Sequence, residues 1–362
     1  MPHLTELQRI PTSGARAVEA FTLDGTDYIA VPQLAYDAPG TPRGMNGGTS
    51  NTDVLMFRRE GNRFVKAGTL PGPGGEDAEL FTIDGTTYLA VACIRVGSGP
   101  YNFNIGQHIY VWRDGTFQPF QTILGYAAKQ WRHFTIGDDH FLGLAQNRPG
   151  DTDVPSAIFK WTGGEFVHLQ DIPSRGGYNF HAFELDGTHY LAHADHALPS
   201  RLYRWDGSAF VEHQDLVEIG GRAFETFSDG EHTYMAVANI RNDSVLLRWD
   251  GTNFVDHAVL DGGKGGRELD LIETPQGTFV IRVNFITGGP QAPHPPLKSQ
   301  LYKLVDGKLQ LVEEYDTCGG TDVTHFAGPD GSIQVAVSSG LNADIGFAGE
   351  SVIYAFDPEG KL

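Results

Sequence analysis

The sequence predicts an all-β protein, a β-propeller in which all 362 residues form one domain of seven four-stranded blades. Three observations lead to this prediction. The phrase "FTIDGTTYLAV" returns in variant form along the chain, a second hairpin pattern follows each copy, and the copies lie 44 to 60 residues apart. Four short strands per unit, repeated at about this period, are typical of propeller blades.

The first two strands of each unit flank a tight turn. In residues 78–91, "AELFTIDGTTYLAV", the Asp-Gly pair supplies the positive φ angles of a two-residue hairpin turn, and the flanking Phe, Ile, Tyr and Val favour strands. The Phe of this phrase serves as a marker for each blade. The marker position is occupied, in chain order, by Phe21, Phe81, Phe134, Phe183, Phe227, Ile272 and Phe326.

A second hairpin supplies the third and fourth strands of each unit, as in "LYRWDGSAFVEH" (202–213) and "LLRWDGTNFVDH" (246–257). Its turn recurs at Gly61-Asn62, Asp114-Gly115, Gly163-Gly164, Asp206-Gly207, Asp250-Gly251, Asp306-Gly307 and Glu359-Gly360. The last of these turns is followed by two residues only, so the seventh unit lacks its fourth strand. The segment "LTELQRI" (4–10) matches the fourth strands "FVHLQDI" (166–172) and "FVEHQDL" (210–216), and we expect it to complete the last blade and remove an exposed edge.

Composition excludes several classes of function. A net charge of -19 argues against nucleic acids and anionic membranes as partners, and no apolar run reaches the roughly 18 residues of a membrane span. The start of the chain lacks the pattern of a signal peptide, so a cytoplasmic location is expected. Cys93 and Cys318 lie far apart and form no CxxC pair, which argues against a disulfide framework or a zinc-thiolate site.

Neither a metal nor a cofactor is expected. In the run "HADH" (193–196) strand alternation sends the side chains to different faces, so three ligands from it would be strained. The Asp-Gly turns lack the ligand spacing of a calcium loop, and no Gly-rich phosphate loop opens a helix.

Unequal loops between the second and third strands indicate a binding face. They are long in blades one (35–53), two (96–107), three (148–156), six (286–300) and seven (339–351), and short in blades four and five, "HALPS" and "RNDS". Because these loops all open on one face, we expect a raised rim over five blades and an opening beside blades four and five. Tolerated surface insertions would explain one long loop but not five.

The innermost strand predicts two kinds of layer around the axis, because strand side chains alternate between faces. The position three residues before the marker is apolar in every unit, and we expect it to pack between blades: Val18, Ala78, Trp131, Phe180, Phe224, Leu269 and Val323. The position two residues before the marker is polar in every unit, and we expect it to line the axis: Glu19, Glu79, Arg132, His181, Glu225, Asp270 and Thr324. Structural and functional explanations of this polar layer both stay open.

A second polar layer ends the second strands, at Gln33, Cys93, Gln146, Asp195, Asn239, Asn284 and Ser338. The favoured explanation is structural, the satisfaction of buried backbone groups. Two polar residues also interrupt an apolar interblade position, His193 in blade four and Arg282 in blade six. The hairpin register places them beside Phe180 and Leu269, and each needs a partner because an unpaired buried charge is costly. They are either paired structural residues or part of a site.

The repeated phrase, "F-x-(I/L)-D-G-x-x-Y-L-A-V-A-N" followed by "(I/L)-Y-x-W-x-G-x-F-x-x-x-Q-x-(I/L)", resembles the epilepsy-associated repeat, also called the EPTP repeat. The resemblance covers essentially all seven units and is weakest in blade six. It implies a seven-bladed propeller. It also implies a protein-binding role, since animal proteins with this repeat are mainly secreted or cell-surface proteins whose propellers bind other proteins.

Two functions remain possible from the sequence. The preferred one is a cofactor-independent enzyme for a small molecule, an isomerase, lyase or cyclase, with its pocket at the axial end under the long loops. Its expected catalytic residues are His181, Glu79, Glu225, Arg132 and Asp270. Its expected substrate-binding residues are Glu19, Trp131, Phe180, His193, Phe224, Arg282 and Tyr101. The alternative is a non-catalytic scaffold that binds a protein or glycan on the same face through rim aromatics such as Tyr36, Tyr101, Phe103 and Phe347.

Overall fold

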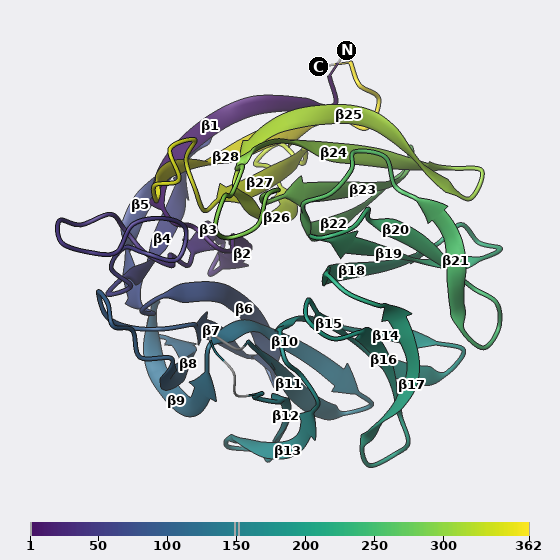
Figure 1. Cartoon of the computed structure of the whole chain (residues 1–362), viewed down its shortest axis with the longest axis horizontal. Helices are drawn as coiled ribbons and strands as arrows, with labels where there is room; N and C mark the ends of the chain where they lie inside the picture. Colours follow the sequence, from purple (N-terminus) through teal and green to yellow (C-terminus); the bar gives the residue numbers. More distant parts are fainter. Residues whose placement is uncertain (1, 148–149, 151–152, 362) are drawn as a thin grey trace.

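The structure, a computed structural model, describes residues 2–147, 150 and 153–361 as seven antiparallel four-stranded sheets arranged around a central axis (Figure 1). Within each blade the strands follow one another from the axis outward. The predicted fold class, a propeller of seven four-stranded blades, is confirmed. No helix in this part of the chain is long and apolar enough to span a membrane.

The first four blades follow one another in chain order. Blade one comprises β2 (Glu19–Leu23), β3 (Thr26–Val31), β4 (Asp53–Glu60) and β5 (Arg63–Pro71). Blade two comprises β6 (Gly75–Ile83), β7 (Thr86–Cys93), β8 (Asn104–Arg113) and β9 (Thr116–Tyr126). Blade three comprises β10 (Ala128–Ile136), β11 (Asp139–Gln146), β12 (Ser156–Trp161) and β13 (Phe166–Ile172). Blade four comprises β14 (Gly177–Leu185), β15 (Thr188–Asp195), β16 (Ser200–Trp205) and β17 (Phe210–Val217).

The remaining three blades complete the ring. Blade five comprises β18 (Gly221–Ser228), β19 (Thr233–Asn239), β20 (Val245–Trp249) and β21 (Phe254–Val259). Blade six comprises β22 (Gly266–Thr274), β23 (Gly277–Asn284), β24 (Pro296–Val305) and β25 (Lys308–Cys318). Blade seven comprises β26 (Gly320–Ala327), β27 (Ile333–Ser339) and β28 (Ala348–Phe356), and its outermost strand is β1 (Leu4–Ser13).

The N-terminal strand closes the ring, as predicted. β1 pairs with β28 from Leu4 opposite Phe356 to Ser13 opposite Ala348, so it is three residues longer than the segment 4–10 identified from the repeat. The backbone N–H of Asp357 donates to the carbonyl of His3, which brings the two ends of the chain together (Figure 1). β28 therefore has a partner on both sides, and the last blade has no missing strand.

The Asp-Gly pairs form two kinds of turn. In the first hairpins of blades one, two and four both residues have positive φ, for example 48° at Asp84 and 75° at Gly85, as a two-residue turn requires. In the second hairpins of blades four and five only the glycine does, and the turn is wider. There the carboxylates of Asp206 and Asp250 accept backbone N–H groups two and three residues further on.

The core lies between the blades. All seven apolar residues predicted to pack there are buried, from Trp131 at 0% exposed to Val323 at 5%. Trp131 packs edge to face on Phe159, with ring centroids 5.8 Å apart, and belongs to a cluster shared by blades two and three. The alternation of the inner strand is therefore confirmed for this layer.

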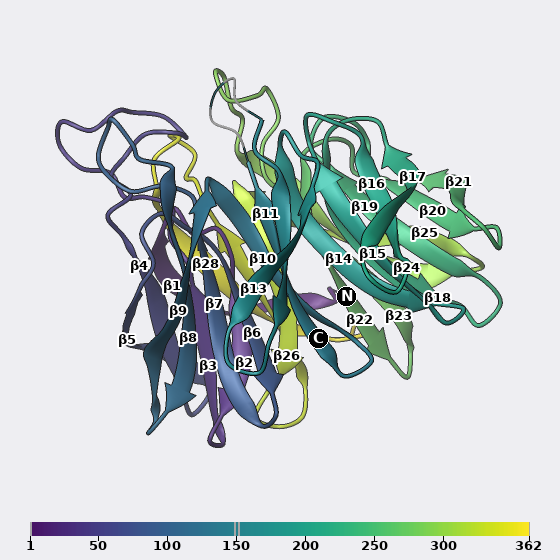
Figure 2. The same cartoon turned by 90° about the horizontal axis from the view of Figure 1, so that it is seen from below.

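Long loops gather on one face of the ring, where the chain also crosses from blade to blade. Figure 2 shows the loops that follow β3 and β23 projecting from the same face. Thr52, in the loop of blade one, donates to the Gln33 carbonyl and accepts the N–H of Gly74, which lies in the crossover to blade two. Part of the predicted rim of blade three, residues 148–149 and 151–152, lies outside the described residues.

Candidate functional site

Each blade begins with a pair of small residues that directs the next side chain. The pairs are Gly14-Ala15, Gly74-Gly75, Ala127-Ala128, Gly176-Gly177, Gly220-Gly221, Gly265-Gly266 and Gly319-Gly320. The first member has positive φ in every blade except the fourth. Its carbonyl accepts an N–H from just beyond the second strand, as from Leu34 to Gly14 and from Ile240 to Gly220. This contact fixes where the inner strand starts.

A β-bulge follows these small residues in blades two to seven, where the register of the first hairpin shifts by at least one residue. A bulge places an extra residue in the strand and re-aims its side chain. The residues at this position, with the equivalent residue of blade one, form a ring around the axis, here called the bulge ring: Arg16, Glu76, Lys129, Tyr178, Arg222, Arg267 and Thr321.

The bulge ring divides the axial space in two. Above it lies a pocket of 390 Å³, here called the upper pocket, which opens on the loop face. Below it lies a cavity of 160 Å³, here called the lower cavity. Arg16, Glu76, Lys129 and Tyr178 border both spaces. The residues that separate them were missed by sequence reasoning, which placed its axial layer at a different position of the inner strand.

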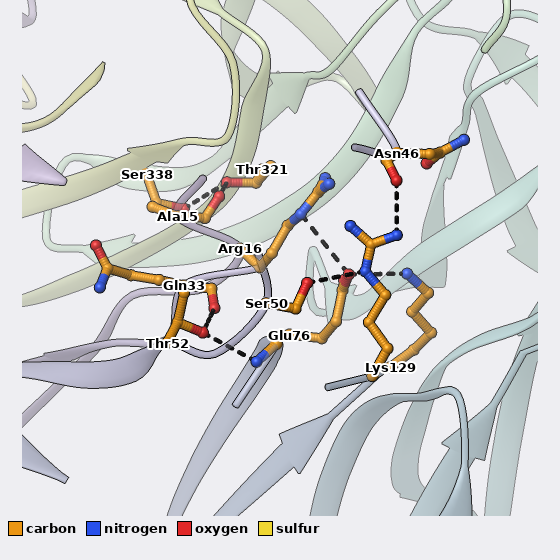
Figure 3. Close-up of polar contacts among 12 residues, drawn as sticks. Ala15, Arg16, Gln33, Asn46, Ser50, Thr52, Glu76, Lys129, Thr321 and Ser338 are labelled. Atoms are coloured by element: carbon orange, nitrogen blue, oxygen red, sulfur yellow. Dashed lines mark hydrogen bonds and ion pairs between the residues drawn. The ribbon is translucent and has the colours of Figure 1, made fainter. Parts of the chain in front are cut away.

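Glu76 is the centre of the bulge ring. Its carboxylate lies 3.0 Å from Lys129 Nζ, 3.7 Å from Arg16 Nε and 3.6 Å from Arg267 Nη2, and Figure 3 shows Arg16, Glu76 and Lys129 pointing toward one another. Burial alone would raise the pKa of Glu76, but these three cations lower it to about 2. Glu76 is therefore a buried carboxylate that stays charged.

Loops provide the walls of the upper pocket. Met45 and Asn46 come from the loop of blade one, Thr287 and Pro290 from that of blade six, and Lys264 from the crossover between blades five and six. The short connections of blades four and five contribute His196 and Arg241. The long loops of blades one and six thus contribute to the walls of the pocket, and blades four and five contribute only their short connections.

The lower cavity contains the polar layer predicted from alternation. All seven residues of that layer border it: Glu19, Glu79, Arg132, His181, Glu225, Asp270 and Thr324. Asp77, Glu268 and Asp322 border it as well, because each lies two residues before a member of that layer and so on the same face of its strand. Arg132 Nη1 lies 3.4 Å from the Glu79 carboxylate, and this pairing raises the pKa of Arg132.

Burial and neighbouring charges shift the pKa values of several side chains in the lower cavity. Burial, with Asp270 nearby, raises the pKa of Glu225 to about 8, and burial raises the pKa of Glu268 to about 7. Burial and the charge of Arg132 lower the pKa of His181 to about 3, and its Nε2 lies 3.0 Å from Thr226 Oγ1. A histidine held neutral across the physiological range is a poor general acid.

The structure does not bring every predicted site residue to these spaces. Phe180 and Phe224 border the lower cavity, whereas Trp131 is fully buried between blades. Tyr101 lies in the loop of blade two, where its ring stacks under the Arg95 guanidinium at 3.7 Å from the centroid. Trp131 and Tyr101 line neither the upper pocket nor the lower cavity as the structure describes them.

His193 and Arg282 are core residues with partners. They stand opposite Phe180 and Leu269, as the register predicted. His193 Nε2 lies 3.0 Å from Ser156 Oγ in the preceding blade, and Arg282 donates to the Gln300 side chain at 2.6 Å. Both are at most 1% exposed, and neither is among the described residues that line the two axial spaces.

The second polar layer serves the backbone, as predicted. Asn239 Nδ2 donates to the Ile219 carbonyl, and its Oδ1 accepts the N–H groups of Arg241 and Asn242. Asp195 accepts N–H groups from Arg175 and Gly176. Burial would raise the pKa of Asp195, but these backbone donors lower it. In blades four and five this layer thus ties the second strand to the preceding crossover.

Comparison with protein-family models matches the EPTP domain over residues 4–50, 116–162, 165–206 and 209–250. These segments begin with an outermost strand, either β1 or the last strand of a blade, and end within the following blade. The repeat is thus offset by one strand from the structural blade. This offset explains why the first repeat supplies the outermost strand of blade seven.

Three curated relatives match parts of the chain, and two of them are named for the EAR repeat. The thrombospondin-type laminin G domain and EAR repeat-containing protein of Mus musculus is 36% identical over 121 residues, and that of Homo sapiens is 37% identical over 91 residues. The leucine-rich repeat LGI family member 3 of Macaca fascicularis is 28% identical over 193 residues. The matches cover 33%, 24% and 52% of this chain, and only 17%, 14% and 30% of the relatives.

Solved structures agree on the fold. The chain is similar to BBS1N, in a crystal structure of its complex with ARL6DN, with a TM-score of 0.61 and 12% identity over 100% of this chain and 99% of that one. It is also similar to Saccharomyces cerevisiae Sqt1, with a TM-score of 0.57 and 11% identity over 99% and 100% of the two chains. At such low identity these likenesses support the propeller architecture alone.

The comparisons overturn the preferred function from the sequence. The prediction of a cofactor-independent isomerase, lyase or cyclase is wrong, because the chain matches EPTP repeats and their relatives, for which the resemblance implies binding propellers. The catalytic roles expected of His181, Glu79, Glu225, Arg132 and Asp270 depended on that prediction. The resemblance itself is confirmed: this chain is a seven-bladed β-propeller of the EPTP, or epilepsy-associated repeat, family.

Proposed function

We propose that this propeller is a non-catalytic binding domain that holds a protein partner on its loop face. The observation that carries the proposal is the upper pocket, which opens on that face and has its floor on the axis and its walls in the long loops. Loops of repeat proteins are where partners are usually recognised, since the strands beneath are committed to the core. The EPTP repeats support a protein partner in particular.

Side-chain hydrogen bonds hold neighbouring loops of the loop face in fixed positions. Arg95 Nη1 and Nη2 donate to the carbonyls of Asn46 and Gly47, each at 2.7 Å, and its Nε donates to Ser50 Oγ at 2.9 Å. Tyr101 adds a hydrogen bond to the Gly48 carbonyl at 2.7 Å. The loop of blade two therefore braces that of blade one, and such preorganisation lowers the entropic cost of binding.

The aromatic residues expected on the rim differ in how much of each side chain is exposed. Tyr36 is 43% exposed, whereas Phe347 is 1% exposed and packs with Leu34 and Phe285 under the loops. Phe347 therefore supports the loop face from below. Tyr36 is the aromatic side chain best placed to touch a partner.

Site-specific photo-cross-linking tests this proposal. A benzoylphenylalanine replaces Tyr36 on the loop face in one variant, and exposed Glu273, near the hairpin tips of the opposite face, in the other. After irradiation of cells that make the protein, we expect an adduct with one protein from position 36 and not from position 273. Calorimetry with the purified partner then measures its affinity for the unmodified propeller.

Equal adducts from both positions would contradict the proposal, and so would a purified partner that does not bind. Each variant is first melted to confirm that it retains the fold.

A further inference from the structure

The upper pocket has an unbalanced charge. In the part of the chain that the structure describes, six cationic side chains line it, against one carboxylate, Glu76. The cations are Arg16, Arg95, Lys129, Arg222, Arg241 and Lys264. The whole chain carries a net charge of -19, so this cluster is a local reversal of sign. Focused positive charge in a concave site attracts anions.

Two of these cations have nitrogen atoms without a hydrogen-bond partner. Among the described residues, Arg16 Nε and Arg222 Nε and Nη1 make no hydrogen bond, although the two residues are only 5% and 8% exposed. Arg95 provides a contrast in the same pocket, because its Nε, Nη1 and Nη2 all donate to the loop of blade one. Arg95 therefore uses its donors to brace a loop, whereas Arg16 and Arg222 keep buried N–H donors that make no hydrogen bond to a described residue.

Glu76 does not neutralise the cluster. It already lies within 4 Å of Lys129, Arg16 and Arg267, so one negative charge faces three positive charges. Burial lowers the pKa of Lys129 and of Arg222, and with the repulsion from Arg267 it lowers the pKa of Arg16 to about 10. Buried cations that are not balanced reduce stability, and an anion in the pocket would relieve that cost.

Apolar side chains surround the charged floor. Leu34, Met45, Ile94, Ile240, Phe285 and Ile286 line the same pocket. Its volume of 390 Å³ is within the range of about 300 to 1,000 Å³ found for ligand sites. The pocket therefore suits a group with an anionic end on the floor and an apolar body against the walls.

From this arrangement we propose that the upper pocket binds a carboxylate borne on an apolar group, which the protein partner proposed above inserts along the axis. The carboxylate lies on the floor and accepts hydrogen bonds from Arg16 and Arg222. Guanidinium groups match the flat, two-pronged geometry of a carboxylate. The statement that a protein partner supplies this carboxylate rests on the proposed function. The statement that the pocket binds a carboxylate does not.

Isothermal titration of the full chain with N-acetyl-leucine tests the chemistry. The matched ligand is the carboxamide of N-acetyl-leucine, which differs only in lacking the charge. Losing a hydrogen bond to a charged group costs about 1.5 to 3 kcal/mol, so we expect the carboxamide and the variant Arg222→Gln each to weaken binding about ten-fold or more. The variant Arg241→Gln changes an exposed side chain at the pocket mouth and serves if Arg222→Gln does not fold.

Arg204→Gln is the control variant, because it removes the same charge from an exposed position on the outer part of blade four. It should bind N-acetyl-leucine like the wild type. Equal affinity for acid and carboxamide, an equal loss in Arg204→Gln, or binding of inorganic phosphate but not of N-acetyl-leucine would each overturn the inference.

The partner found by cross-linking distinguishes the source of the carboxylate. If a partner segment occupies the pocket, N-acetyl-leucine competes with it and Arg222→Gln weakens the complex, while Arg204→Gln does not. If the partner binds Arg222→Gln as well as it binds the wild type, the claim that it inserts a carboxylate into the upper pocket is wrong, and the proposed function still stands. Failure of the cross-linking itself would overturn the proposed function and leave the acid-binding result intact.

Discussion

The Arg222 guanidinium stacks on the ring of Tyr178, with 3.5 Å between Arg222 Cζ and the ring centroid. Arg267 Nη1 donates to the Tyr178 hydroxyl at 3.0 Å, and Lys129 Nζ lies 5.2 Å from the same ring. Burial would raise the pKa of Tyr178, but the charges of Arg222, Arg267 and Lys129 lower it to about 7, from an ordinary value of 10.0. One phenol on the propeller axis thus ionises near neutral pH.

A near-ultraviolet titration should reveal this phenol. We expect one tyrosine to form phenolate near pH 7 in the wild type and none to do so in Tyr178→Phe. The folded-state pKa is depressed, so phenolate formation stabilises the fold fully above pH 10 and this contribution is lost as pH falls from 10 to 7. A wild-type chain in which every tyrosine ionises above pH 9 would contradict the geometry of the bulge ring.

Two Glu→Gln substitutions should differ sharply in cost. Glu76 is ionised with a pKa of about 2 and faces three buried cations, so Glu76→Gln at pH 7 should lose about 3 to 5 kcal/mol of unfolding free energy. Glu225, with a pKa of about 8, is mostly protonated at pH 7, and an amide of the same shape replaces a neutral acid. Glu225→Gln should therefore change stability little.

Urea unfolding of both variants at pH 7 and at pH 3 checks this contrast. The depressed pKa of Glu76 means that its contribution is present above pH 4.5 and declines as pH falls toward 2, so the cost of Glu76→Gln should shrink at pH 3. Similar losses for the two variants at pH 7 would show that the charges are not distributed as described.

Much of the fold could be predicted because the same pattern of strands and turns recurs in every repeat. The Asp-Gly turns, the alternation that buries Trp131 and Phe224, and the displaced strand of residues 4–10 all follow from comparing units with one another. The bulge ring could not be reached in this way, since one extra residue in a strand reverses the alternation on which the prediction rested. A signal was nevertheless present: the position five residues before the marker is polar in every unit.

The walls of the upper pocket could not be predicted from the sequence for another reason. Met45, Asn46 and Thr287 lie in loops whose length and sequence differ from blade to blade, and their placement depends on tertiary contacts such as those of Arg95. The enzyme hypothesis, which the comparisons overturned, also depended on information that the sequence does not contain. A ring of carboxylates and one histidine has the composition of an acid-base site, and only burial tells that His181 stays neutral.

Removal of residues 2–11 should destabilise the ring, because it leaves β28 with an unpaired edge. We expect a melting temperature lower by many degrees and a tendency to aggregate. The control is a permuted chain in which residues 2–13 follow residue 361, where the strand can pair with β28 as a hairpin. The permuted chain should melt close to the wild type, and a truncated chain as stable as the wild type would contradict closure by β1.

The start of blade five offers a test of how the bulge ring is positioned. Gly220 has a φ of +85°, and a Cβ there would lie 2.3 Å from Asn239 Oδ1 and 2.9 Å from Arg241 Cβ. Gly230, at the tip of the following hairpin, has a φ of +92° and no atom within 4 Å of its Cβ position. Both Gly→Ala variants thus carry the same backbone strain, of about 1 to 3 kcal/mol, and only Gly220→Ala adds a steric clash.

We expect Gly220→Ala to lose clearly more unfolding free energy than Gly230→Ala in urea titrations. Its clash also displaces Asn239, whose side chain holds the crossover before Arg222, so Gly220→Ala should weaken binding of N-acetyl-leucine while Gly230→Ala does not. Equal losses of stability in the two variants would mean that the blade start relaxes freely and that the contact between Gly220 and the end of β19 does not fix the bulge.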